Sequence, residues 1–428
     1  MHLSTDIGDL HTPKLWRDFI SITGWDVWKK RMDSLRQQSH HNLLHAWLLE
    51  KRHSLEFQIE AIHRYFLLKN KLPRILQNPQ LYRAAAFACS AARIYQRLSS
   101  DAKNRFCGMI ISGLKDEYGL ESFAFELEIA NHLMRKGYDV TFSDLEQQGD
   151  YDYLIKHLSG QVEIEVECKL ITGDKGRKVH QTCLAQLLGQ LEPIVRPLLL
   201  APGGKIVHIE VPSRLEANRD TMRQIASTVE QKIAASSAII QSRVCTVEIT
   251  NFDVRDSPFS NPQSINSATL PEFIGSHFDV RLPTLTAFSS HTGDACVVVE
   301  VHSRESDSLV KRIYRVAKES AQKQFSHTRP ALIALKLGEL TSRQIRELHQ
   351  LQQNQEPHAL QAIATRFFRN SSRDHVHSMC FLSQSEIFVE QTSSGLYTPG
   401  GVQGQGSVYV FQNLRHPAYN DPRYYLFN

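Results

Sequence analysis

The chain has 428 residues, of which 41% are apolar and 22% are charged, and its formal net charge is +4 at pH 7. This composition is typical of a soluble globular protein, and the length predicts two or three domains. No apolar run approaches twenty residues and the N-terminus lacks a secretory signal, so we expect a cytoplasmic protein without a membrane partner. Seven scattered cysteines without a CxxC pair argue against a disulfide framework and against a zinc site.

Residues 1–118 predict an all-helical module, with apolar residues at helical spacing and Pro73 and Pro79 at junctions. This part holds 18 Lys and Arg against 11 Asp and Glu. One interpretation is a module that presents arginines and aromatics to a phosphate backbone. The other is a helical bundle with solvated arginines, and it is favoured because basic helix faces are common.

Residues 121–137 predict a helix that ends at a glycine. At about 100° per residue, Glu126 falls near the middle of the apolar face, whereas Glu128 falls roughly opposite, in line with Arg135. A carboxylate centred on a buried stripe is costly unless it is paired or bound to a cation. Glu126 is therefore the functional candidate, and Glu128 is expected to be the exposed partner of a basic residue.

A short strand at 138–142 and a loop at 144–149 precede a predicted hairpin. Its strands are 150–155 (DYDYLI) and 162–169 (VEIEVECK), and 156–161 forms the turn. Folding about that turn places Asp150 and Asp152 opposite Glu165 and Glu167. Carboxylates that face each other across a hairpin repel, so this arrangement is costly unless a cation lies between them.

The segments GDYDYLI and EVECK, which contain Asp152, Glu167 and Lys169, resemble the PD-(D/E)xK, or restriction-endonuclease-like, nuclease superfamily. The resemblance covers roughly residues 121–188. It implies an αβββαβ core, and the predicted order of helix 121–137, three strands, helix 179–193 and strand 205–211 agrees with that core. Gly149 stands where the family usually has a proline, so Asp150 remains the alternative to Asp152, which the apolar run follows directly.

The resemblance also implies the chemistry, which is metal-dependent hydrolysis of a DNA phosphodiester by an activated water. Asp152, Glu167 and the Cys168 carbonyl would hold Mg²⁺ or Mn²⁺, since hard oxygen ligands favour these ions. Lys169 would orient the attacking hydroxide and stabilise the transition state. Glu126 would hold a second ion or a water. A role in defence or DNA repair is implied by the family alone.

After Lys169, the loop 173–178 is glycine-rich and basic. We expect four side chains in or next to this loop to contact the DNA backbone phosphates beside the cleaved bond: Lys175, Arg177, Lys178 and His180. A solvated turn is an equally good interpretation of the loop alone.

Three regions follow from these patterns: a helical module (1–118), a nuclease core (119–211) and a C-terminal α/β extension (212–428). The extension has an amphipathic helix at 308–324 and a buried strand at 331–336. Residues 320–333 loosely resemble a segment of the superfamily. This resemblance suggests that the strand at 331–336 completes the nuclease sheet, and that residues 245–300 are partly an insertion into the nuclease domain.

We expect DNA as the partner. Three alternatives stay open: an RNA-cleaving enzyme, a nuclease fold that has lost activity, and a non-catalytic nucleic-acid-binding or assembly protein. A homodimer is compatible with the sequence. Asp152, Glu167 and Lys169 could also be polar residues on a solvated strand face, with Glu167 and Lys169 as an ordinary ion pair. Four features that agree with one another argue against this interpretation: the hairpin spacing, Glu126, the order of elements and the basic loop.

Overall fold

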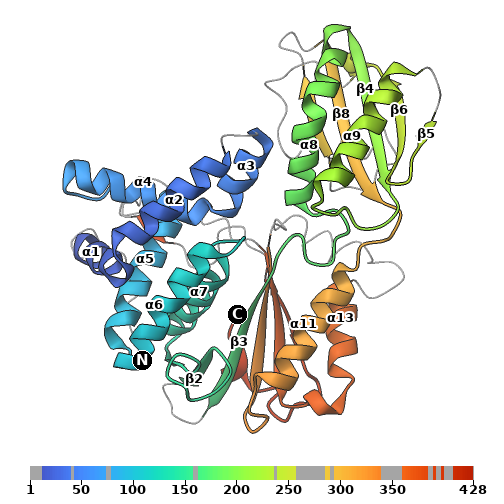
Figure 1. Cartoon of the computed structure of the whole chain (residues 1–428). Helices are drawn as coiled ribbons and strands as arrows, with labels where there is room; N and C mark the ends of the chain where they lie inside the picture. Colours follow the sequence, from blue (N-terminus) through green and yellow to red (C-terminus); the bar gives the residue numbers. More distant parts are fainter. Residues whose placement is uncertain are drawn as a thin grey trace. The chain divides into compact units, whose positions relative to one another are not determined.

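The structure, a computed structural model, shows a mixed α/β protein (Figure 1). It describes residues 12–39, 43–73, 79–157, 162–235, 239–256, 285–289, 294–338, 359–383, 389–391, 397–399 and 408–427. None of the helices in these ranges combines the length and apolarity that a membrane crossing requires. The chain divides into two compact units, and each is described by itself below. The first comprises 1–36, 49–175 and 309–428, and the second comprises 37–48 and 176–308.

The N-terminal part of the first unit is helical, as its apolar spacing predicts. The helices are α1 (Thr12–Thr23), α2 (Trp25–Ser39), α3 (Leu43–Arg52), α4 (Ser54–Lys69), α5 (Pro79–Arg97) and α6 (Ser100–Lys115). Residues 37–39 of α2 and 43–48 of α3 are grouped with the second unit. Their buried aromatic residues, such as Trp16 and Phe106, belong to one hydrophobic cluster with α7 (Glu121–Arg135) and the strands behind it. The expected separate module at 1–118 is therefore wrong as a domain, because its apolar faces are buried against the rest of the first unit.

A six-stranded sheet forms the centre of the first unit. Its strand order is β1-β2-β3-β9-β10-β13. The neighbours β3 and β9, and β9 and β10, are parallel, and the other neighbouring pairs are antiparallel. The bounds are β1 (Tyr138–Phe142), β2 (Tyr153–His157), β3 (Glu163–Ile171), β9 (Ala331–Leu337), β10 (Val376–Leu382) and β13 (Val408–Gln412).

Helices cover both faces of this sheet. On one face, α7 packs on Val166, Leu332 and other residues of even number on β3 and β9. On the other face, α11 (Leu309–Lys323) and α13 (Ala359–Phe368) pack on residues of odd number, such as Ile171 and Ile333 (Figure 1). Strands β9 and β10 are buried along their whole length, which is the pattern of central strands covered on both sides. The expected buried strand at 331–336 is confirmed.

The second unit has its own five-stranded sheet, in the order β5-β6-β4-β8-β7. Its helices α8 and α9 share a hydrophobic cluster with Val207 of β4 and Val299 of β8. The bounds are α8 (Gln181–Val195), η2 (Arg196–Leu200), β4 (Gly203–Val211), α9 (Arg219–Ala234), β5 (Ile239–Gln241), β6 (Thr246–Phe252), η3 (Val254–Asp256), β7 (Leu285–Ser289) and β8 (Ala295–Ser303).

The expected division into a core at 119–211 and an extension at 212–428 differs from the structure. The strand at 205–211 was expected to be the last element of the nuclease core, but as β4 it pairs with β6 and β8 of the second unit. Strand β9 takes the place beside β3 instead. The expected helix at 179–193 also exists, as α8, but it belongs to the second unit. The reason is non-local: β4 and β9 are both apolar strands, and their own residues do not identify which sheet they join.

Four short elements complete the described part of the chain. Strands β11 (Val389–Gln391) and β12 (Tyr397–Pro399) form a two-stranded sheet, and η6 (Ser371–Arg373) precedes β10. After β13, the C-terminal tail contains η7 (Pro422–Tyr424) and contacts α7 and β1 of the first unit. His132 hydrogen-bonds the Leu426 carbonyl at 2.8 Å, and the Tyr138 hydroxyl donates to the Arg423 carbonyl at 2.6 Å.

Candidate active site

The candidate site lies where β2 and β3 meet. The hairpin register pairs Tyr153 with Val166 and Leu154 with Glu165. Asp152 immediately precedes β2, so continuing this register places it opposite Glu167. The expected pairing of Asp150 with Glu165 is wrong, because β2 begins at Tyr153 and Glu165 faces Leu154. The turn residues 158–161 lie outside the described residues.

The Asp152 side chain is held by the backbone of β3. It is 9% exposed, and its Oδ2 accepts a hydrogen bond from the Cys168 amide at 2.6 Å. The amide and carbonyl of one residue in a strand point to the same edge. The Cys168 carbonyl therefore points to the Asp152 side of β3, beyond the last paired residues. One carboxylate and one backbone carbonyl are thus presented at the same edge.

Glu167 is fully buried, at 0% exposure. Its carboxylate forms an ion pair with Lys169, two residues farther along the same strand face. Neither oxygen accepts a well-formed hydrogen bond. Burial raises the carboxyl pKa of Glu167, and the charge of Lys169 and the backbone amide of Asp152 oppose this effect only in part. A buried carboxylate with so few donors is costly, so this side chain can accept a further cation or donor.

Glu126 of α7 and Asp144, which follows β1, complete the acidic group. Burial raises the pKa of Glu126 well above its ordinary value, and the charges of Asp152 and Asp144 raise it further. Burial likewise raises the pKa of Asp152, with Glu167 as the next cause. Glu126 itself is half-buried, and its carboxyl group interacts electrostatically with the hairpin carboxylates.

Sequence reasoning missed Asp144. The Ser143 amide donates to the Asp152 carbonyl at 3.0 Å, which brings the residue after the β1 strand beside the hairpin. Burial raises the pKa of Asp144. The sequence feature that could have identified Asp144 is its position, two residues after a strand that pairs with β2.

Lys169 is the cation of the group, and its side chain is 38% exposed. Burial lowers its pKa, but the charges of Glu167 and Asp152 oppose this effect, so that the pKa is raised overall. Lys169 is therefore an ammonium group at neutral pH. It can donate hydrogen bonds and offset negative charge, whereas a general base would need the neutral amine.

Two carboxylates of this group, those of Asp152 and Glu167, could serve as ligands of a hard divalent cation. Among the residues that the structure describes, no group of three His, Cys, Asp or Glu side chains is arranged to hold a metal ion. Asp152, Glu167 and the Cys168 carbonyl supply three oxygen ligands, and Mg²⁺ commonly completes its shell with waters and substrate. The under-bonded oxygens of Glu167 are the observation that supports this fit.

Two other expected acidic residues do not join the group. Asp150, the alternative ligand, is exposed. Glu165 is buried on the same strand face as Glu167, but the Ser326 amide donates to it at 2.9 Å and Arg329 lies 3.4 Å away. Its charge is thus satisfied locally by the segment that precedes β9.

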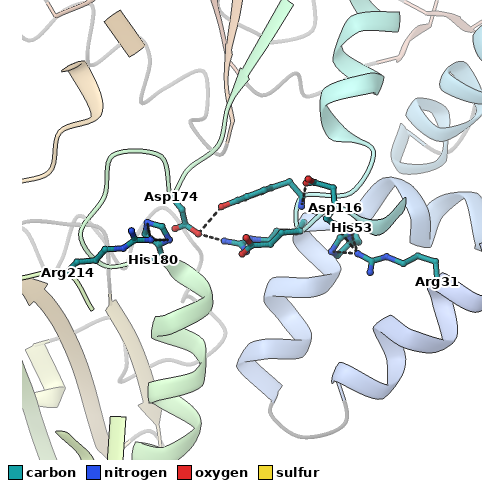
Figure 2. A network of polar contacts seen from close by, with 9 residues as sticks. Arg31, His53, Asp116, Asp174, His180 and Arg214 are labelled. Atoms are coloured by element: carbon teal, nitrogen blue, oxygen red, sulfur yellow. Dashed lines mark hydrogen bonds and ion pairs between the residues drawn. The ribbon is translucent and has the colours of Figure 1, made fainter. Parts of the chain in front are cut away.

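The residues expected to contact phosphates are split between the units. Lys175 ends the first unit, whereas Arg177, Lys178 and His180 belong to the second. In the second unit, Lys178 forms an ion pair with Glu305, and the Arg214 guanidinium lies 3.2 Å from the His180 ring (Figure 2).

The loop after β3 is anchored through its acidic residue. Asp174 is 3% exposed and forms an ion pair with Arg52, at the end of α3. The Tyr118 hydroxyl donates to the same carboxylate at 3.0 Å (Figure 2). Nearby, Arg31 contacts the His53 ring and donates to the Asp116 carbonyl at 3.1 Å. These contacts join the helical part of the first unit to the end of β3.

Glu128 pairs with basic residues as expected, but it is half-buried rather than exposed. It pairs with Arg83 at 2.8 Å and with Lys336 of β9 at 3.1 Å, and its side chain is 30% exposed. Burial raises its pKa, but the charges of Lys336 and Arg83 outweigh burial and lower it to about 2. Glu121 joins the same network, 2.6 Å from Arg83.

Comparisons with protein-family models, with curated proteins and with solved structures found no match to this chain.

Proposed function

We propose that the protein is a metal-dependent nuclease of the restriction-endonuclease-like type that hydrolyses DNA phosphodiester bonds. The observation that carries the proposal is the opposed pair Asp152 and Glu167, with the Lys169 ammonium against Glu167. Such a gathering of buried like charges is costly in the folded protein, which is a recurrent feature of catalytic sites.

The order of elements supports the same proposal. In the first unit, α7 is followed by β1, β2 and β3, and after the second unit the chain returns as α11 and β9. This order is the αβββαβ succession that the resemblance implies, with residues 176–308 inserted before the second helix. The insertion is longer than the 245–300 segment that the sequence suggested.

The side chains have distinct parts in this proposal. Asp152, Glu167 and the Cys168 carbonyl would hold Mg²⁺ or Mn²⁺, which when bound acidifies a water and offsets charge on the phosphate. Lys169 would donate a hydrogen bond to the nucleophile or to a phosphate oxygen as negative charge develops. Asp144 and Glu126 would orient waters next to that ligand set through hydrogen bonds.

The decisive experiment measures cleavage of supercoiled plasmid DNA by the purified full chain with Mg²⁺ or Mn²⁺. We expect cleavage that EDTA abolishes. Lys169→Ala and Glu167→Gln should each lower the rate by about 10²–10³-fold, as removal of a transition-state donor does. DNA binding measured in EDTA should stay within about threefold of wild type, since both changes remove interactions made during reaction rather than on binding.

Asp150→Asn is the matched control, because Asp150 is an exposed acid two residues from Asp152. It should leave the rate unchanged. Binding without cleavage under any divalent ion would contradict the nuclease and favour the non-catalytic nucleic-acid-binding protein. Cleavage of RNA with intact DNA would favour the RNA-cleaving alternative.

A further inference from the structure

Helix α11 carries a basic surface on the side that faces away from the sheet. Ile313, Ala317 and Ala321 are buried against the strands. Glu319, the one acidic residue of the helix, lies 2.7 Å from Arg315. The basic residues of α11 are all exposed: Lys311, Arg312, Arg315, Lys318 and Lys323.

Helix α13 extends this surface. Arg366 is exposed, and its guanidinium lies over the Tyr314 ring of α11, 4.8 Å from the ring centre. Arg369, one turn farther along the chain, is also exposed. Stacking on Tyr314 limits the freedom of Arg366 and keeps the cations of the two helices together. We call these seven side chains the basic face: Lys311, Arg312, Arg315, Lys318, Lys323, Arg366 and Arg369.

Little negative charge balances the basic face. Within the described ranges, Arg315 is its one member in an ion pair, and that pair is with Glu319. Like charges three or four residues apart on a helix, such as Lys311 and Arg315, repel each other and destabilise the helix. An anionic partner would reverse that cost.

We propose that the basic face binds the phosphate backbone of a nucleic acid duplex. From Lys311 to Lys323 the helix rises by about 18 Å, at about 1.5 Å per residue. That length corresponds to about five base pairs along a duplex, at about 3.4 Å per pair. Four of the seven cations are arginines, whose planar forks match phosphate oxygens. The identity of the partner rests on the proposed nuclease function.

A membrane surface is the competing partner for a basic helix, and the packing of α11 argues against it. Helices that lie on membranes insert an apolar face into the lipid. Here the apolar face of α11 is buried against the sheet, and Val310 is the one large apolar side chain of the helix that is clearly exposed.

The test is binding of a short duplex DNA to the full chain in EDTA, measured by fluorescence anisotropy over a range of salt concentrations. The triple variant Arg312→Gln, Lys318→Gln, Lys323→Gln removes three exposed cations and leaves the Arg315 and Arg366 contacts in place. We expect at least tenfold weaker binding at about 0.1 M salt, and a log–log salt slope smaller by about 2–3. The loss should be equal for unrelated DNA sequences.

The matched control is Lys29→Gln, Lys30→Gln, Lys115→Gln, which removes three exposed lysines from α2 and α6 of the same unit. It should leave affinity and salt slope nearly unchanged. Circular dichroism and urea unfolding check that both variants are folded. Equal losses in the two variants, or no loss in the first, would overturn the proposal.

Two further outcomes are informative. If wild type binds phosphatidylserine vesicles but not the duplex, the basic face is a membrane surface and the proposal fails. Since binding is measured without divalent ions, it is independent of cleavage. A protein that binds through the basic face but never cuts would refute the proposed nuclease alone, and one that cuts with the triple variant binding normally would refute this inference alone.

Discussion

At the scale of single residues, the candidate site is defined by charges that the fold holds together at a cost. The carboxyl pKa values of Glu126, Asp152, Glu167 and Asp144 are all raised, with burial as the largest cause. Glu128, two residues from Glu126 on α7, shows the opposite shift because the charges of Lys336 and Arg83 outweigh the effect of burial. The same residue type thus has two roles that its neighbours determine.

The raised pKa values predict how the metal-free protein responds to pH. A carboxyl group whose pKa is raised on folding favours the folded state below its ordinary pKa, and this contribution is lost as pH rises through the folded value. Glu126→Gln should therefore increase the free energy of unfolding at pH 8 by about 1 kcal/mol and have little effect near pH 4.

Urea unfolding at both pH values, with and without Mg²⁺, checks this expectation. Mg²⁺ should stabilise the wild type more at pH 8 than near pH 4, where the ligands are protonated. Glu128→Gln serves as the contrast. Its lowered pKa stabilises the protein above pH 4.5, so its loss should destabilise by about 2 kcal/mol at pH 8 and less as pH falls toward 2. Destabilisation by Glu126→Gln at pH 8 would contradict the proposed site.

At the scale of elements, the end of β3 is fixed by the contacts of one loop residue. The carboxylate of Asp174 is paired with Arg52 of α3, and the side chains are 4% and 3% exposed. Because β3 carries Glu167 and Lys169, this anchor also limits the motion of the strand that presents them.

Arg52→Met should therefore be strongly destabilising. It leaves Asp174 buried with Tyr118 as a neutral donor, and the loss of one partner of a buried pair costs about 3–5 kcal/mol. Urea denaturation measures the change. Arg64→Met, at a position 62% exposed and paired with Glu60 one turn away, is the control and should change stability by less than about 1 kcal/mol. Similar values for the two variants would show that the Asp174 anchor is not important.

At the scale of the whole molecule, residues 176–308 of the second unit interrupt the first unit between β3 and α11. Its ends are held together, because the Ser308 amide donates to the Gly176 carbonyl at 2.7 Å. The six-stranded sheet of the first unit contains no strand from the second. An inserted unit with adjacent ends is the arrangement that tolerates removal best.

We expect that replacing residues 177–307 with a short Gly-Ser linker leaves the first unit folded. Its unfolding should stay cooperative, since both faces of the sheet remain covered by α7, α11 and α13. Circular dichroism and urea unfolding of the shortened chain check this. A chain that is disordered without the insert would show that the first unit depends on the second for its stability.

The sequence by itself determined most of the helices and strands. Periodicity identified α7, β1, β3, α11 and β9 within a few residues, because each has a regular apolar face. It also predicted that Asp152 faces Glu167 and that Glu126 points inward, since hairpin pairing and helix phase are local properties.

Only the tertiary structure decided which strands share a sheet. Strands β4 and β9 are both apolar, and the choice of β9 as the neighbour of β3 depends on contacts between residues more than 150 positions apart. The same holds for Asp144, which reaches the site through strand pairing, and for Glu165, which Ser326 and Arg329 satisfy from a distant segment. The spacing of residues along the chain does not predict such long-range contacts, because they depend on how separate elements pack in three dimensions.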